Sequence, residues 1–355
     1  MQEINISNIE VPNCNGPSIN LSCMIDRVKA MPPQNYLFRG IKIPSIGAIF
    51  GVSKAGKTIV VESLAYSVAA GLPKFIGENI YSGNQRVLLI SLEEYYQSRT
   101  ERNEKQVKYF TEMYDLDSSW INNVFVVDEN FPKHLLKDED WKMLDDEIGR
   151  IQPTMVMIDS LTRLTIEAIE DSTVATKLMK KLREITYKHN IAMVLIHHTH
   201  KMENRPITLA TLAGSRVIGQ ELDFMIGINR TTENDRYIKD VAYRYAADDS
   251  EFVTKFIINE NLVIESIGLA REHVLLEGTT APPEQNHNDE LLTQYFIDFS
   301  QGDNVVIVET KNLVAQFVRP NIMSKPTLHA SIERLINNGV IEKVELGKYV
   351  LVDLS

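Results

Sequence analysis

The chain has 355 residues, of which 44% are hydrophobic and 24% charged, and this composition suits about two globular domains with ordinary cores. Its net charge of −11 argues against a surface coated with nucleic acid, so any DNA contact must come from particular segments. No apolar run approaches the roughly 20 residues that span a bilayer, and the first residues lack the pattern of a signal peptide. We therefore expect a cytoplasmic protein without a membrane partner, whose two cysteines, Cys14 and Cys23, are free thiols.

Residues 1–35 are polar and proline-containing, and we expect an N-terminal arm with at most one short helix around Met24–Lys29. Across residues 36–277, short apolar runs alternate with helical patterns, which predicts an α/β domain with a mainly parallel, twisted sheet flanked by helices. The expected strands are Ile46–Phe50, Val87–Ser91, Val124–Val127, Met155–Ile158, Ala192–Ile196, Phe224–Ile228, Val241–Tyr245 and Phe256–Ile258. The expected helices are Lys57–Ala70, Gln97–Tyr109, Glu139–Arg150 and Ser172–Lys188.

Residues 278–288 have no apolar periodicity and indicate a linker. Residues 289–355 then show three helical patterns followed by two short strands, which is the plan of a winged-helix domain. The helices are expected at Asp289–Phe299, Val308–Phe317 and Lys325–Asn338, and the strands at Val340–Glu345 and Tyr349–Val352. The third helix ends at an Asn-Gly pair, which is a helix-termination signal.

A phosphate-binding loop is predicted at residues 51–58, between an expected strand and an expected helix. Its residues are Gly51, Val52, Ser53, Lys54, Ala55, Gly56, Lys57 and Thr58. The two glycines let the backbone curl so that its N–H groups point at phosphate oxygens, and the helix presents its positive end to the same anion. Lys57 supplies a charge to the β- and γ-phosphates, and the Thr58 hydroxyl can ligate Mg²⁺. The segment therefore predicts a site for ATP with Mg²⁺.

Lys54 is a second cation within this loop. Two alternatives stay open for its side chain: contact with the γ-phosphate or a neighbouring subunit, or full solvation.

A carboxylate for the metal is predicted at Asp159, which ends the apolar run Met155–Ile158. Many strands end in an aspartate, so the pattern is weak alone. It gains meaning because it lies about 95 residues after a phosphate-binding loop, where P-loop NTPases place a metal-holding aspartate at a strand end. We expect Thr58 and Asp159 to be the protein's Mg²⁺ ligands.

Four segments resemble the RecA-like ATPases and, within that group, the plasmid RepA-type and DnaB-type ring helicases. They are VLLISLEE at 87–94, AMVLIHHTHK at 192–201, NRPITLATLAGS at 204–215, and DFMIGINR at 223–230 with the hairpin that follows. The resemblance covers about residues 36–265. It implies a RecA-like P-loop NTPase fold, ATP hydrolysis and a homo-oligomeric ring, which we expect to be a hexamer.

The resemblance also implies roles for individual residues. Glu93, at a strand end, would orient the attacking water, with Glu94 as the alternative. His198 falls where DnaB-type motors have a residue that senses the γ-phosphate. Arg244 would be the arginine finger supplied by a neighbouring subunit, although Arg216 and Arg230 lie in the same region and stay open as alternatives.

DNA contacts are expected in two places. The resemblance implies that residues 199–214 line the central channel of the ring and grip a single strand through backbone groups, independently of base sequence. The candidates there are Lys201 and Arg205. Arg163 and Thr162, shortly after Asp159, are a second candidate for the channel. For duplex DNA, the exposed candidates of the winged helix are Lys325, Thr327, Arg334 and Lys348. Residues 289–355 nevertheless carry nine acidic and six basic side chains, so docking to protein is an alternative.

These features together predict an ATP-dependent DNA motor, a RepA-like ring-shaped replicative helicase of a plasmid, phage or other mobile element. Three alternatives stay open. The first is a RecA- or RadA-like ATPase that remodels DNA in recombination or transposition. The second is a winged-helix regulator switched by nucleotide, and the third is an ATPase of a defence system.

Overall fold

The computed structural model describes residues 18–81, 83–200, 205–231, 234–246, 252–280, 283–299, 306–320, 322–337 and 340–352. The chain divides into two compact units, Met1–Glu272 and His273–Ser355, each of which is described by itself. Among the described residues, none of the helices combines the length and the apolar character needed to cross a membrane.

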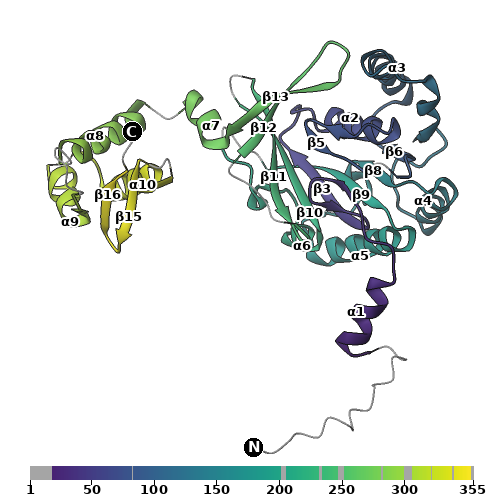
Figure 1. Ribbon diagram of the computed structural model, residues 1–355, viewed down its shortest axis with the longest axis horizontal. Helices are drawn as coiled ribbons and strands as arrows, with labels where there is room; N and C mark the ends of the chain where they lie inside the picture. The colour runs from purple at the N-terminus through teal and green to yellow at the C-terminus, as the bar shows by residue number, and fades with distance from the viewer. Residues whose placement is uncertain are drawn as a thin grey trace, which may run out of the picture. The chain divides into compact units, whose positions relative to one another are not determined.

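In the described part of the first unit, the main sheet has nine strands, and its parallel portion contains six of the eight strands predicted from the apolar runs (Figure 1). The other two predicted strands overlap antiparallel strands, and the one expected at Val241–Tyr245 begins earlier, at Arg236, and ends at Tyr243. In spatial order the parallel strands are β10 (Phe224–Arg230), β3 (Ser45–Gly51), β9 (Ala192–His198), β8 (Met155–Asp159), β6 (Val87–Ser91) and β7 (Val124–Val126). The antiparallel strands β11 (Arg236–Tyr243), β12 (Phe252–Ile258) and β13 (Ile264–Arg271) continue the sheet beyond β10.

The central strands are apolar at nearly every position because both faces of the sheet are covered. Every residue of β3 is buried, and so are the residues of β8 before its final aspartate. This confirms the predicted class, an α/β fold of the RecA-like P-loop type with a mainly parallel sheet. Strand β13 is different, since most of its residues after the first two are exposed, and the sequence did not predict it.

Helices cover the two faces of the sheet in the arrangement that right-handed crossovers require. α2 and α3 lie on one face, and α4, α5 and α6 lie on the other (Figure 1). Their bounds are α2 (Lys57–Ala69), α3 (Tyr96–Met113), α4 (Asp138–Ile151), α5 (Ser172–His189) and α6 (Arg216–Glu221). α5 shows why these boundaries occur: the Asp171 side chain accepts from the Thr173 and Val174 N–H groups at its start, and Asn190 ends it in a left-handed conformation.

Short elements complete the first unit. They are strands β1 (Tyr36–Phe38), β2 (Ile41–Lys42), β4 (Lys74–Phe75) and β5 (Glu78–Asn79), and the 3₁₀ turns η1 (Ser118–Asn123), η2 (Leu161–Arg163) and η3 (Leu209–Thr211). Helix α1 (Leu21–Lys29) precedes them, somewhat longer than predicted, and none of its residues is buried. Cys23 in α1 belongs to a disulfide, so the expectation of free thiols is wrong, while Cys14 lies outside the described residues.

The second unit contains helices and a small sheet around a core that includes Leu292, Phe296, Phe317 and Leu328. In chain order its elements are α8 (Pro283–Phe299), β14 (Val308–Glu309), α9 (Thr310–Leu313) with the π-helical stretch η4 (Val314–Val318), α10 (Lys325–Asn337), β15 (Ile341–Glu345) and β16 (Lys348–Leu351). The three strands are antiparallel in the order β14-β16-β15. Helices followed by a hairpin were expected here, and the winged-helix assignment stays a prediction.

The structure places helices where the sequence predicted a linker at 278–288. α7 (Glu272–Thr280) extends to residue 280, and α8 begins at Pro283. A proline suits the first position of a helix, because its fixed φ is helical and its missing N–H would have no partner there. The start of α8 was not predicted because the segment is polar and lacks apolar periodicity.

Candidate ATP site

The loop from β3 to α2 has the geometry that its glycines permit. Gly56 adopts a φ of 100°, a left-handed conformation that favours glycine, directly before α2. A Cβ atom on Gly51 would lie 1.8 Å from the carbonyl oxygen of Ile228 on the neighbouring strand β10. Both glycines are therefore needed for the loop to turn tightly beside the sheet, which leaves the start of α2 open to an anion.

Lys57 reaches back across this loop. Its Nζ donates to the carbonyl oxygens of Gly51 at 3.1 Å and Val52 at 2.9 Å, and the residue is only 7% exposed. Burial lowers the pKa of the ammonium, while the nearby carboxylates of Asp159 and Glu93 oppose that shift. A buried cation whose partners are two neutral carbonyls would gain strongly from a phosphate anion.

Thr58 and Asp159 meet as predicted for a metal site. The Thr58 hydroxyl donates to Asp159 Oδ2 at 2.7 Å. Burial raises the pKa of the Asp159 carboxyl to about 6, and the Thr58 hydrogen bond opposes the shift. No cluster of three or more His, Cys, Asp or Glu side chains able to hold a metal occurs among the described residues. A hydroxyl with one carboxylate fits Mg²⁺, which takes oxygen ligands and completes its shell with phosphates and water.

Glu93 emerges next to Asp159 because β6 and β8 pair with Ser91 opposite Asp159. Its side chain is 37% exposed. The hydroxyl of Ser160 donates to Glu93 Oε1, and the hydroxyl of Thr162 lies 3.4 Å from the same oxygen. The carboxylate is thus held at the carboxyl edge of the sheet, beside the expected metal ligand. Ser160 was missed by the sequence, although its position directly after Asp159 at a strand end was a usable signal.

The two histidines that end β9 have different surroundings. His198 pairs in register with Gly51 at the start of the phosphate-binding loop. Its pKa is lowered by burial and by the Lys57 charge, so the imidazole is neutral at neutral pH. His197 is buried, its Nε2 lies 3.0 Å from the Ala213 oxygen, and burial lowers its pKa to about 4. His198 therefore adjoins the loop that would hold phosphate, and His197 adjoins residue 213.

The site geometry agrees with a comparison with known protein families. The family described as AAA domain matches residues 21–204, just over half of the chain. The chain belongs to this AAA domain family. It is a RecA-like P-loop ATPase, and the matched range contains the phosphate-binding loop, Glu93, Asp159 and His198.

A solved structure gives a further comparison. A KaiC-like protein from the hyperthermophilic archaeon Pyrococcus horikoshii is 15% identical, with a TM-score of 0.47, covering 66% of this chain and 99% of its own. No curated protein matches the sequence.

Just after the matched range, residues 205–214 return directly to the end of β9. The N–H of Ala213 donates to the His198 oxygen at 3.0 Å, and the N–H of His200 donates to the Thr211 oxygen at 3.0 Å. Arg205 is exposed at the other end of this segment, and Lys201 lies outside the described residues. The loop predicted to contact DNA is thus hydrogen-bonded to the backbone of the predicted sensor residue.

Arg244 lies far from the phosphate-binding loop of the same chain. It follows Tyr243, which pairs with Phe224, and Phe224 pairs with Gly47 at the amino end of β3. Gly51 follows Gly47 by four residues along the strand, a distance on the order of 13 Å. Arg244 Nη1 lies 3.1 Å from Asp223 Oδ1, and Nη2 donates to the Gln220 oxygen at 3.0 Å.

The two alternative finger residues are placed differently. Arg230 ends β10 near Gly51, at the opposite edge of the sheet from Arg244, and donates to the Asn234 side chain. Arg216 is exposed at the start of α6. Arg244 thus lies at the opposite edge of the sheet from the phosphate-binding loop of the same chain.

The predicted DNA contacts outside the loop have varied surroundings. Arg163 is 41% exposed and contacts Glu93 and His134. In the second unit, Arg334 forms two 2.7 Å hydrogen bonds with Asp289, which tie α10 to α8. The remaining candidates are Thr327, whose hydroxyl bonds to Ser324, Lys348, which pairs with Glu345 at 2.6 Å, and Lys325, which is exposed. Arg334 thus has a structural partner that the sequence did not suggest.

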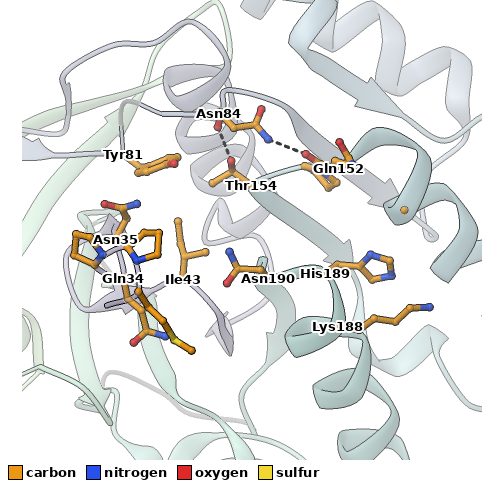
Figure 2. A pocket seen from close by; sticks show the side chains of 15 residues that line it. Gln34, Asn35, Ile43, Tyr81, Asn84, Gln152, Thr154, Lys188, His189 and Asn190 are labelled. Atoms are coloured by element: carbon orange, nitrogen blue, oxygen red, sulfur yellow. Dashed lines mark hydrogen bonds between the residues drawn. The ribbon is translucent and has the colours of Figure 1, made fainter. Parts of the chain in front are cut away.

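Figure 2 shows the lining of a separate hollow of about 670 Å³. Its lining residues precede the parallel strands, whereas the phosphate-binding loop follows the strand β3. Its wall includes the segments that precede β8 and β9, among them Thr154 and Asn190. Figure 2 shows Asn84 bridging this wall, donating to the Gln152 oxygen at 2.8 Å and accepting from the Thr154 hydroxyl at 2.5 Å. This hollow is therefore not part of the ATP site.

Proposed function

We propose that this ATPase is a motor for single-stranded DNA that works as a closed ring of identical subunits, a RepA-type helicase in the replication of a plasmid, phage or other mobile element. The observation that carries the proposal is the connection between the ATP site and the loop at 205–214. His198 lies beside Gly51, and the carbonyl oxygen of His198 accepts a hydrogen bond from the N–H of Ala213. A change at the γ-phosphate would therefore reach the loop through one residue.

Each residue of the site would have a separate role in ATP hydrolysis. Lys57 would exchange the carbonyl oxygens of Gly51 and Val52 for phosphate oxygens when ATP enters. Glu93, held by the Ser160 hydroxyl, would accept a hydrogen bond from water and orient it for in-line attack. Mg²⁺, held by Thr58 and Asp159 together with the nucleotide, would neutralise charge on the phosphate oxygens. His198 would donate to the γ-phosphate as a neutral imidazole.

The position of Arg244 supports assembly into a ring. An arginine finger stabilises the charge of the transition state and contributes about 10³–10⁵ in rate when a neighbour supplies it. Arg244 is placed on the order of 13 Å along the sheet from its own Gly51, too far to act within one subunit. Its partner Asp223 is buried and also pairs with Arg183. Arg244 can therefore leave Asp223 for a phosphate while the Asp223 carboxylate keeps Arg183 as a partner.

Contact with DNA would use backbone groups and few charges. The AAA domain is part of a chain with net charge −11, so a channel that binds DNA needs locally exposed cations such as Arg205 and Arg163. Binding of this kind follows the phosphate backbone and falls steeply with salt. For the second unit we propose duplex DNA contact around Lys325, with docking to protein as the alternative that its acidic composition favours.

The proposal is tested with the full chain and forked DNA. We expect ATP hydrolysis, strand displacement of at least one fork polarity and rings in negative-stain images, with Lys57→Ala losing turnover and unwinding together. Hydrolysis without displacement at any polarity or salt concentration would leave an ATPase that is not a helicase. Filaments on DNA in place of rings would favour a RecA-like role in recombination or transposition.

A further inference from the structure

We infer that Arg102 is a positioning residue for ATP hydrolysis, because it bridges Glu94, in the turn between β6 and α3, and Glu62, in the helix that follows the phosphate-binding loop. The inference rests on the proposed role of Glu93 and extends it to Arg102 and Glu62, which no sequence motif singled out. Arg102 acts through the backbone that carries Glu93 and would not itself contact the reacting groups.

One end of the bridge is anchored in α2. Glu62 is 0% exposed and follows Thr58 by four residues, so both side chains lie on one side of the helix. Its carboxylate accepts from Arg102 Nε at 3.1 Å and Nη2 at 2.8 Å, and from Gln106 Nε2 at 3.1 Å. The buried charge is thus matched by a guanidinium and an amide, both from α3.

The other end of the bridge lies beside the predicted catalytic carboxylate. Arg102 Nη1 donates to Glu94 Oε1 at 2.5 Å, and Nη2 donates to Glu94 Oε2 at 2.6 Å. The Arg102 side chain is 14% exposed and that of Glu94 is 34% exposed. One planar guanidinium therefore contacts carboxylates from two elements, and the paired bonds to Glu94 set direction as well as distance.

This arrangement suits positioning better than stability. A buried ion pair seldom adds net stability, and apolar side chains of similar volume often serve as well. Its bidentate geometry does define where residue 94 sits relative to α2. Glu93 is the adjacent residue, and a misplacement of about 1 Å at a reacting group can cost on the order of a hundredfold in rate.

The same contacts bear on the choice between Glu93 and Glu94. Both oxygens of Glu94 are engaged by Arg102, whereas Glu93 is held by hydroxyls at the edge of the site. A water-orienting carboxylate needs an oxygen directed at the nucleotide. The geometry assigns the two neighbouring glutamates different tasks: Glu93 toward the reaction and Glu94 toward the bridge.

The test uses Glu94→Gln, Arg102→Lys and the double variant in steady-state ATPase and nucleotide-binding assays. Glu94→Gln leaves the Glu62–Arg102 contact in place, so the fold does not depend on it. Arg102→Lys keeps the charge but loses the paired bonds to Glu94. We expect each single variant to lower kcat at least tenfold, with KM and the ATP Kd within twofold of normal. The double variant should be no worse than the worse single one, because both substitutions break the same Arg102–Glu94 contact.

Controls separate this inference from the role of Glu93. Glu147→Gln removes an ion pair of similar length, to Arg150 on the exposed face of α4, and should leave kcat unchanged. Near-normal kcat in both single variants, or additive losses in the double one, would overturn the bridge. Additivity would mean that Glu94 acts directly on the reaction. If Glu93→Gln retained normal turnover, the proposed catalytic role of Glu93 would fail, a result distinct from an inactive Glu93→Gln beside an active Arg102→Lys.

Discussion

The guanidinium of Arg163 lies against the carboxylate of Glu93, with 3.6 Å between Arg163 Nε and Glu93 Oε1. Arg163 is also a predicted DNA contact, so a DNA phosphate and Glu93 would compete for it. The interaction free energy of a partly exposed ion pair of this kind is about 0.5–1 kcal/mol.

We therefore predict that Arg163→Ala raises DNA-free ATP turnover about two- to fivefold and reduces its stimulation by single-stranded DNA. The measurement is kcat with and without a DNA strand at fixed salt. Arg150→Ala, which breaks an exposed pair away from the site, is the control. A lower DNA-free rate would mean that Arg163 supports Glu93 and does not restrain it.

Mixed subunits test the proposed position of Arg244. We predict that Arg244→Ala and Lys57→Ala are each inactive alone. Mixed together they should regain partial turnover, because an intact site forms wherever a normal Lys57 faces a normal Arg244. The measurement is ATPase rate against mixing ratio, after exchange of subunits. Rates that stay at background at every ratio would argue against action between subunits, and Arg230 would be the next residue to examine.

Gly51 provides a prediction on stability. A Cβ at this position would overlap the Ile228 oxygen, which is main chain and cannot rotate away. We predict that Gly51→Ala destabilises the fold by about 1–3 kcal/mol or more and abolishes ATP binding. Gly149→Ala is a matched control within α4, where the nearest atom is 3.4 Å away, and it should be neutral or stabilising by about 0.5–1 kcal/mol. Urea unfolding of both variants measures the difference, and equal stabilities would contradict the loop geometry.

His197 predicts a loss of stability in acid. Its folded pKa of about 4 is below the ordinary value of 6.5, so the unfolded chain binds the proton more readily between these values. Stability should therefore fall as pH drops from about 6.5 toward 4, by about 1.4 kcal/mol per pH unit and about 3 kcal/mol at most. His197→Gln can still donate to Ala213 and should lack this component. Urea unfolding at pH 7.5, 6 and 5 compares the two proteins, and parallel pH profiles would refute the prediction.

The sequence was informative where a pattern is local. The buried parallel strands show as uninterrupted apolar runs, and β6 occupies the predicted residues. The phosphate-binding loop was recognisable because each of its fixed residues has a local reason: the glycines allow the tight turn, and the lysine and threonine serve the phosphate and the metal. β13 was missed because its largely exposed residues do not alternate between apolar and polar.

The rest depends on contacts between distant segments. Arg102 and Glu62 are 40 residues apart, and α3 reads as a charged, solvated helix until its packing against α2 is known. The partner of Arg244 was also not predictable. Asp223 directly precedes β10, Arg244 directly follows β11, and the two meet only because these strands pair antiparallel. Patterns along the chain give residue types and spacing, whereas these pairings are decided by which helices and strands meet.

The strand that carries the phosphate-binding loop lies between β9 on one side and β10 on the other. Its two neighbours lead to different places: β9 to the loop at 205–214, and β10 to the hairpin that ends at Arg244. A displacement of Gly51 would press directly on His198 and on the backbone of Ile228. In the ring that we propose, one event at the nucleotide would thus be transmitted along two routes at once, to a bound DNA strand and to the neighbouring subunit. If so, the same displacement of Gly51 would set both the order in which the subunits hydrolyse ATP and the movement along DNA.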